Sequence, residues 1–241
     1  MKNILITGVS KGLGLHIASK FLNNNWHVWG VSRSKTTLLK NLQHEYSDSF
    51  HWKSFDISNT HHVKKELFRD FIDFDVPLHG IVNNAAIAYD DIISNLRLGL
   101  LEEMYKVNVF SPMMITKFAI RNMLFHHIRG SIIHISSISV HTGYKGLAMY
   151  ASTKGALEAF SKNTAREWGE RGIRSNCVVA GFMETAMSDT LTNRQKDRIY
   201  KRTSLKKATT TKTVAETVYF LSSDNAESIT GQNIHVDSGT I

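Results

Sequence analysis

The chain has 241 residues, 42% of them hydrophobic and 21% charged, a composition that excludes a disordered, collagen-like or disulfide-stabilised protein. Its length fits one domain spanning 1–241, with a core of its own. The net charge of +8 permits acidic or phosphorylated partners, but the basic residues are scattered outside 194–207 and no aromatic repeats accompany them, so we expect no nucleic-acid binding.

Signals for secretion or membrane insertion are missing from the sequence. The first apolar stretch is broken at Gly8, too early for a signal-peptide core, and nowhere do about 18 apolar residues follow one another. The single cysteine, Cys177, cannot form an internal disulfide, as suits the reducing cytosol. We therefore expect a soluble, cytoplasmic protein that makes no membrane contact.

Apolar runs rich in β-forming residues alternate with longer amphipathic stretches along the chain. The runs predict strands at 4–7, 27–32, 132–136 and 175–179, and the stretches predict helices at 13–24, 100–127 and 150–171. The predicted strands are almost continuously hydrophobic, as strands buried on both faces are. The sequence thus predicts a single-domain α/β fold with a doubly wound parallel sheet and helices on both faces.

A glycine-rich turn directly follows the first predicted strand and opens the first predicted helix. It reads Thr7-Gly8-Val9-Ser10-Lys11-Gly12-Leu13-Gly14. At such a turn the backbone can approach a pyrophosphate, which binds the free N–H groups of the helix N-terminus. This context favours a Rossmann fold, but the spacing differs from the usual dinucleotide fingerprint, and glycine clusters after strands also form plain turns. The motif alone leaves both interpretations open.

The end of the second predicted strand carries a cation where an NAD-specific site would carry a carboxylate. Arg33 stands there, and no Asp or Glu accompanies it. A guanidinium binds a ribose 2′-phosphate in a charge-assisted pair, and Lys11 of the glycine turn could add a second cation. The sequence therefore favours NADP over NAD as cofactor. The alternative is that Arg33 is a solvated loop residue.

Two residues at helical spacing form a candidate acid/base pair. Tyr150 and Lys154 are four residues apart and should share one helix face. A neighbouring cation favours the phenolate and lowers the pKa of a tyrosine, which would make Tyr150 usable as an acid or base. By itself, this spacing is also common among ordinary surface pairs.

Polar and small residues follow two predicted strands at the edge where open α/β folds bind ligands. The strand at 132–136 runs into Ser137, thirteen residues before Tyr150, and Asn84 and Ala85 follow another strand. A hydroxyl at this edge can hold a substrate carbonyl, and the small residues leave room for a ribose. The sequence predicts that these groups share one crevice with the glycine turn.

Taken in order, these motifs resemble the short-chain dehydrogenase/reductase family over essentially the whole chain. The matching motifs are Thr-Gly-x-x-x-Gly-x-Gly, Asn-Asn-Ala-Ala, a serine and Tyr-x-x-x-Lys. The resemblance implies an NADPH-dependent enzyme that reduces a carbonyl to an alcohol. It implies that Tyr150 donates the proton, Ser137 orients the carbonyl oxygen and Lys154 holds the nicotinamide ribose. Asn108 matches the fourth catalytic position.

Pro112 bears on Asn108 independently of the resemblance. Proline has no N–H group to donate to the Asn108 carbonyl, four residues earlier, so a helix there would leave that carbonyl free. We expect it to bind the water through which the family's proton relay joins Lys154 to solvent. An ordinary helical kink is an equally good interpretation.

The resemblance extends the cofactor site to Asp56 beside the adenine, Asn84 near the ribose and Thr185 toward the carboxamide. Where the family usually has Pro-Gly, this chain has Ala180-Gly181, so we expect a more mobile loop at Thr185. The complete predicted cofactor set is Gly8, Ser10, Lys11, Gly12, Leu13, Gly14, Arg33, Asp56, Ile57, Asn84, Ala85, Tyr150, Lys154 and Thr185. We expect no metal site.

The substrate is less closely specified than the reaction. The predicted substrate-binding residues are Ser137, Ser139, His141, Tyr144 and Met183, with a lid at 188–207. The chain is most similar to bacterial β-ketoacyl-acyl-carrier-protein reductases of fatty acid biosynthesis, and Arg171 matches a basic residue implicated there in carrier docking. The basic lid could attract an acyl-carrier protein, although a solvated helix face is the simpler interpretation.

Two other functions stay open. The enzyme could reduce a free ketone, a sugar or a secondary metabolite, or the chain could bind NADP without turnover as a sensor or scaffold. Members of the family usually assemble through their long helices, here 100–127 and 150–171, which implies a homodimer or homotetramer.

Overall fold

In the computed structural model, which describes residues 1–185 and 192–241, seven parallel strands form one sheet. The strands are β1 (Asn3–Thr7), β2 (His27–Ser32), β3 (Phe50–Ser54), β4 (Gly80–Asn83), β5 (Ser131–Ser137), β6 (Arg174–Ala180) and β7 (Asn233–Val236). Their order across the sheet is β3-β2-β1-β4-β5-β6-β7. The predicted doubly wound α/β fold is confirmed.

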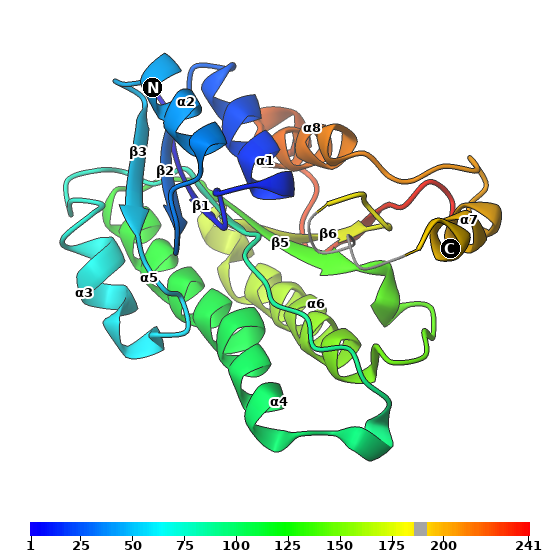
Figure 1. Ribbon diagram of the computed structural model, residues 1–241. Helices are drawn as coiled ribbons and strands as arrows, with labels where there is room; N and C mark the ends of the chain where they lie inside the picture. Colours follow the sequence, from blue (N-terminus) through cyan, green and yellow to red (C-terminus); the bar gives the residue numbers. More distant parts are fainter. Residues whose placement is uncertain (186–191) are drawn as a thin grey trace.

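Helices connect these strands and cover the sheet (Figure 1). They are α1 (Gly12–Leu22), α2 (Thr37–Glu45), α3 (Val63–Phe68), α4 (Leu98–Tyr105), α5 (Ser111–Phe125), α6 (Ala148–Trp168), α7 (Asn193–Arg202) and α8 (Thr211–Ser222). Shorter turns are η1 (Thr60–His62), η2 (Ile93–Asn95), η3 (Lys106–Phe110), η4 (Ile138–Val140), η5 (Gly169–Arg171) and η6 (Asp224–Ala226). No helix of the described residues is long and apolar enough to cross a bilayer.

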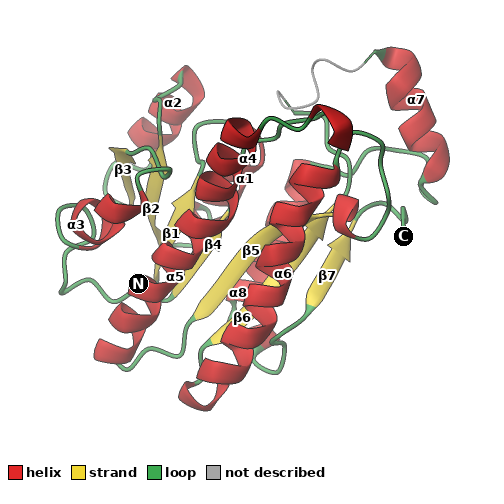
Figure 2. Cartoon of the chain, turned by 90° about the horizontal axis from the view of Figure 1, so that it is seen from below, coloured by secondary structure: helices red, strands yellow, loops and turns green. Residues whose placement is uncertain are grey.

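The sheet divides the core into two layers because successive strand residues point to opposite faces. On β1, Ile4 and Ile6 pack with residues of α1 and α8, whereas Leu5 packs with residues of α3 and α5. Figures 1 and 2 show α1 and α8 on one face, with α5 and α6 on the other. Burial on both faces explains why the predicted strands lack polar alternation.

The chain changes direction across the sheet at β1, which pairs with β2 on one side and β4 on the other. Connections on the two sides therefore diverge at the carboxyl ends of β1 and β4, the place where open α/β sheets bind ligands. In Figure 2, α7 lies at this end of the sheet. The fold thus directs the glycine turn after β1 and the polar residues after β4 and β5 to one edge.

Candidate active site

The glycine turn after β1 depends on two close backbone approaches. Gly8 has a φ of +77°, a left-handed conformation that favours glycine. A Cβ atom on Gly14 would lie 2.1 Å from the Gly8 carbonyl oxygen, so no larger residue fits without moving the turn. The first turn of α1 is therefore held tightly against the loop that precedes it.

Hydrogen bonds from neighbouring strands fix the same turn. Asn84 donates from Nδ2 to the Thr7 carbonyl at 2.9 Å and to the Gly8 carbonyl at 3.3 Å. Oγ1 of Thr7 accepts from the backbone N–H groups of Asn84 and Ala85, both at 3.0 Å. The end of β4 and the glycine turn thus form one rigid unit, and Asn84 belongs to it through its side chain.

The start of α1 suits an anionic ligand. Within the described residues no side chain caps this helix at Lys11, so its first N–H groups keep their donor capacity. Thr185 lies beside this turn, because its Cγ2 atom would be 3.7 Å from a Cβ atom on Gly12. The predicted contacts Ser10 and Leu13 belong to the same segment. The uncapped helix start and the glycine turn fit the diphosphate of a dinucleotide.

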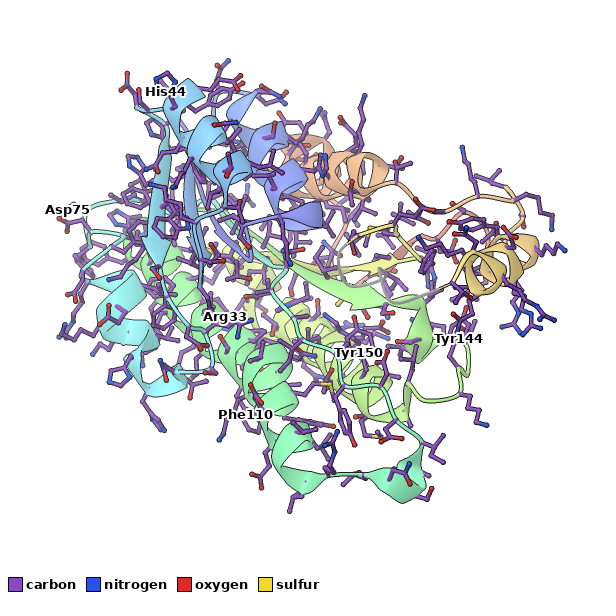
Figure 3. All side chains as sticks on the ribbon, viewed as in Figure 1. Arg33, His44, Asp75, Phe110, Tyr144 and Tyr150 are labelled. Carbon is purple, nitrogen blue, oxygen red and sulfur yellow. The ribbon has the colours of Figure 1, made fainter. Side chains whose placement is uncertain are left out.

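The loop after β2 brings Arg33 to the same edge. Its side chain is exposed and labelled in Figure 3, while its carbonyl accepts a 3.1 Å hydrogen bond from Ser54. Thr36 connects the two loops, because its Oγ1 atom donates to the Ser10 carbonyl at 2.5 Å. Arg33 is thus available to an anion bound near the glycine turn.

Asp56 and Ile57 follow β3, next to this loop. One oxygen of Asp56 accepts the backbone N–H of Ser58 at 2.9 Å, which forms a tight turn. Ile57 is buried in the core with Leu5 and Val31. Their predicted contact with the adenine depends on this turn, which fixes the backbone at the edge of the crevice.

The face of α6 that points to the sheet carries the predicted acid/base pair. Nζ of Lys154 lies 5.7 Å from the centre of the Tyr150 ring and donates to the Ile135 carbonyl at 2.8 Å. Lys154 is buried, and burial lowers the pKa of its ammonium group to about 8. Tyr150 is labelled on this helix in Figure 3.

The expectation that Lys154 lowers the pKa of Tyr150 is wrong for this structure. Burial raises the pKa of Tyr150 to about 12, the negative charge of Asp90 adds to the rise, and a hydrogen bond with Ser137 opposes it. The ammonium group is directed to the Ile135 carbonyl and does not offset the cost of burying a phenolate. The phenol therefore holds its proton at neutral pH.

Ser137 ends β5 and brings a hydroxyl to Tyr150. Besides its hydrogen bond with Tyr150, its Oγ atom accepts from Oγ of Ser139 at 3.0 Å and from the Ser139 backbone N–H at 3.2 Å. These contacts explain why β5 passes directly into the short turn η4. Ser137, Tyr150 and Lys154, predicted separately, lie together.

Asn108 lies in a π-helical segment, η3, which separates α4 from α5. The backbone N–H of Ser111 donates to the Lys106 carbonyl, five residues earlier. The sequence predicted one helix over 100–127; the interruption falls beside Pro112, as the missing N–H implies. The proposed relay water at the Asn108 carbonyl stays a prediction.

The Asn108 side chain joins three segments. Its Oδ1 atom accepts from the Ile87 backbone N–H at 2.9 Å, and Nδ2 donates to the Ile87 carbonyl at 2.8 Å and to Oγ1 of Thr153 at 3.1 Å. Thr153 immediately precedes Lys154. Asn108 thereby anchors the segment after β4 to the helix that carries the acid/base pair.

The predicted substrate residues separate into two groups. Ser139 contacts Ser137, and Tyr144 lies in the loop between η4 and α6, labelled in Figure 3. His141 instead directs Nε2 to Glu158 at 3.2 Å and packs against His235, and Met183 packs against the core cluster of α1 and α8. The side chains of His141 and Met183 thus pack against other residues of the same chain.

The predicted lid is only partly described. Residues 188–191 lie outside the described residues, while 192–207 form the exposed helix α7 and the turn after it. Thr192 and Gln195 form a capping box at the start of α7. Its basic residues are Arg194, Lys196, Arg198, Lys201 and Arg202, and helical spacing places all of them except Lys196 on one exposed, cationic face.

The sequence did not predict two carboxyl groups that lie at this site. Asp90 acts on Tyr150 through its charge, and burial raises the pKa of Asp90 itself. Glu158 is buried one helical turn beyond Lys154. The four-residue spacing could have revealed Glu158, because it continues the helix face of the acid/base pair; no spacing pointed to Asp90.

Comparison with known proteins gives consistent matches. A family model described as enoyl-(acyl carrier protein) reductase matches residues 8–240. The chain is 30% identical to 3-oxoacyl-[acyl-carrier-protein] reductase FabG of Chlamydia pneumoniae, covering 99% of this chain and 96% of that protein. It is also 30% identical to L-xylulose reductase of Caenorhabditis elegans, with coverage of 99% and 95%.

A solved structure, ElxO with NADP bound, superimposes with a TM-score of 0.89 at 29% identity, covering 99% of this chain and 98% of that one. Together with the glycine turn and the Ser137, Tyr150 and Lys154 cluster, these matches identify the class of protein. The chain belongs to the short-chain dehydrogenase/reductase family of oxidoreductases.

Proposed function

We propose that this protein is an NADPH-dependent reductase that converts a carbonyl group into an alcohol within one catalytic domain. The observation that carries the proposal is the meeting of Ser137, Tyr150 and Lys154 at the carboxyl edge of the sheet, next to the glycine turn. When bound, NADPH supplies the hydride for the carbonyl carbon. The protein side chains supply the proton and hold the reacting groups.

In the proposed reaction, the Tyr150 phenol donates its proton to the carbonyl oxygen. A pKa of about 12 keeps the phenol protonated at neutral pH, so the proton is present to be donated, although this pKa lies above the range in which proton transfer is most efficient. Ser137 orients the carbonyl oxygen through its hydroxyl group. Lys154 binds the ribose hydroxyls with its ammonium group, and Asn108 holds the adjacent part of α6 in place.

The cofactor would lie along the glycine turn. Gly8, Gly12 and Gly14 would admit the diphosphate, Asp56 and Ile57 would border the adenine, and the exposed Arg33 would bind the 2′-phosphate. The ElxO structure with NADP bound supports this cofactor preference. Lys11 would add a second positive charge at the helix start.

As substrate we propose a β-ketoacyl thioester carried by an acyl-carrier protein, as in fatty acid biosynthesis. The FabG relatives and the exposed cationic face of α7, together with Arg171, support a carrier with acidic surface residues. A free sugar is the second candidate, because L-xylulose reductase matches the chain equally well in identity.

Parallel assays of NADPH oxidation would decide between these substrates. We expect acetoacetyl-carrier protein to be reduced with a higher kcat/KM than a free acetoacetyl thioester or L-xylulose, and this advantage to shrink as salt screens the charges. Arg198→Glu should reduce only the carrier-linked rate. Lys212→Glu, an exposed charge on α8, is the matched control.

The same assays test the broader proposal. Tyr150→Phe should lower kcat by about 10²- to 10⁴-fold, leaving a measurable residual rate, while NADPH binding persists, because only the proton donor is removed. Preference for L-xylulose would overturn the thioester assignment alone. Tight NADPH binding without turnover of any carbonyl would instead favour the sensor or scaffold function.

We also propose that the protein assembles as a homodimer or homotetramer through the helices around η3. Leu98 and Phe110 are 63% and 48% exposed there, and they line a surface hollow with Leu101 and Tyr105. Covering such apolar area is favourable. Sedimentation velocity measures the mass directly, and a monomer at micromolar concentration would contradict assembly.

A further inference from the structure

A second buried cluster lies beside the proposed catalytic residues and is centred on Glu158. This residue follows Tyr150 by eight positions and Lys154 by four on α6, so all three occupy one face of the helix. Its side chain is buried, at 8% exposure. A carboxylate in such a place is costly unless donors surround it.

Donors from three different segments surround this carboxylate. Ser136 of β5 donates from Oγ to Oε1 at 2.5 Å, and Asn233 of β7 donates from Nδ2 to Oε2 at 2.7 Å. His141, at the end of η4, places Nε2 3.2 Å from Oε1 and 3.1 Å from Oε2. Ser136 and Asn233 donate to the carboxylate, and His141 does so in the tautomer that carries its proton on Nε2.

Two of these contacts enclose Ser137. Ser136 immediately precedes it, and His141 immediately follows the short turn η4 that comes after it. Between them, Ser139 donates to the Ser137 hydroxyl at 3.0 Å. The backbone on both sides of Ser137 is therefore held by one side chain of α6, the helix that also carries Tyr150.

We propose that Glu158 is a positioning residue that sets the distance between the Ser137 and Tyr150 hydroxyls. It does so by fixing the end of β5 and the start of η4 to α6, without touching the substrate. The expected effect on kcat rests on the proposed function, whereas the expected effect on the separation of the two hydroxyls does not. A displacement of about 1 Å in such a pair can cost on the order of 10²-fold in rate.

The contact to Asn233 offers a matched control. It holds the edge strand β7 to the same carboxylate, but no proposed catalytic residue lies on that strand. A merely structural role for Glu158 predicts that loss of Asn233 and loss of Ser136 have similar effects on rate. A positioning role predicts that only loss of Ser136 slows the reaction.

The kinetic experiment compares Glu158→Gln, Ser136→Ala and Asn233→Ala with the unaltered protein. We expect kcat to fall about 10- to 100-fold in the first two variants, with the NADPH dissociation constant changed less than about 3-fold. Asn233→Ala should keep kcat within about 3-fold of the unaltered protein, even if its Tm falls as much as that of the other two variants. Equal loss of kcat in Ser136→Ala and Asn233→Ala would overturn the proposal.

A double-variant test separates positioning from folding. In a Tyr150→Phe background, Glu158→Gln should cause no further loss of the residual rate, because the group that it positions is gone. An undiminished further loss would overturn the proposal. Where Glu158→Gln does not fold, Ser136→Ala and His141→Ala each remove a single contact and give the same comparison.

Crystal structures supply a measurement that does not need turnover. In Glu158→Gln or Ser136→Ala, we expect the separation between Ser137 Oγ and Tyr150 Oη to increase by more than about 0.5 Å, or Ser137 to change rotamer. An unchanged pair would overturn the positioning role whatever the activity. Absence of turnover in the unaltered protein would instead overturn only the proposed function.

Discussion

The ammonium group of Lys154 lies 5.7 Å from the centre of the Tyr150 ring and donates its hydrogen bond to the backbone of β5. Burial acts on the two residues in opposite directions, raising the pKa of the phenol to about 12 and lowering that of the ammonium to about 8. Both neutral forms are favoured by the same desolvation. Within the working pH range, Lys154 is therefore the member of the pair that titrates.

This difference predicts how activity depends on pH. Protonated Lys154 is the form that binds ribose hydroxyls best, so kcat/KM for NADPH should be level from pH 6 to about 7.5. Above a pKa of about 8 it should fall by up to about tenfold per pH unit. Lys154→Arg stays protonated, so its kcat/KM should be lower overall but should not fall above about pH 8. A decline of the same shape in both proteins would contradict the prediction.

Cofactor choice should depend on Arg33. Removing its guanidinium with Arg33→Ala should lower kcat/KM for NADPH about 10- to 100-fold, the value of a charge-assisted pair, and change that for NADH less than about 3-fold. Lys35→Ala is the control from the same loop, because the Lys35 ammonium lies over the Trp52 ring, 5.1 Å from its centre. Equal losses with both cofactors in Arg33→Ala would exclude a 2′-phosphate contact.

Gly14→Ala should disrupt the turn. The new methyl group would lie 2.1 Å from the Gly8 carbonyl oxygen. We therefore expect the free energy of unfolding to fall by roughly 2 kcal/mol and NADPH binding to become undetectable. Gly99→Ala on α4 is the control, because an added Cβ there has no described atom within 4 Å; it should stabilise the helix by about 0.5–1 kcal/mol. Urea unfolding and NADPH fluorescence titration measure both effects.

His134 should make stability depend on pH. It is fully buried on β5, where burial lowers its pKa from 6.5 to about 3. Between these two pKa values, the unfolded chain binds a proton that the folded protein does not. The contribution of His134 to stability is therefore fully present above pH 6.5 and is lost as the pH falls. From pH 7 to pH 5 this one group should cost about 2 kcal/mol.

The variant His134→Gln removes this titration. Its unfolding free energy, measured in urea at both pH values, should fall by about 2 kcal/mol less than that of the unaltered protein over the same interval. His61→Gln is the control, because His61 is exposed. An identical pH dependence in all three proteins would show that the pKa of His134 is the same in the folded and unfolded states.

The sequence predicted those parts of the site that depend on local patterns. Continuous apolar runs located the ends of β1, β2, β5 and β6 to within one residue, because strands buried on both faces are made of apolar residues. The glycine turn and the Tyr150–Lys154 spacing were also readable, because each lies within one connection or one helix. Pro112 likewise marked the interruption that the structure realises as η3.

Features that depend on packing between distant segments could not be predicted. Glu158 gains its partners from β5, η4 and β7, which the chain order alone does not bring together. The pKa of Tyr150 was misjudged for the same reason: a neighbouring cation is visible in a sequence, but the cost of burial and the charge of Asp90 are not.

The extra residue in the π-helical segment η3 sets the rotational phase between α4 and α5. Each residue of an α-helix advances the chain by about 100°, so deleting one residue between 106 and 110 would restore a regular helix and turn α4 by about that angle relative to α5. The amide of Asn108 would then no longer be aimed at Thr153. A redesign that replaces η3 with regular α-helix to raise the Tm would therefore lose the hydrogen bond between Asn108 and Thr153 of α6.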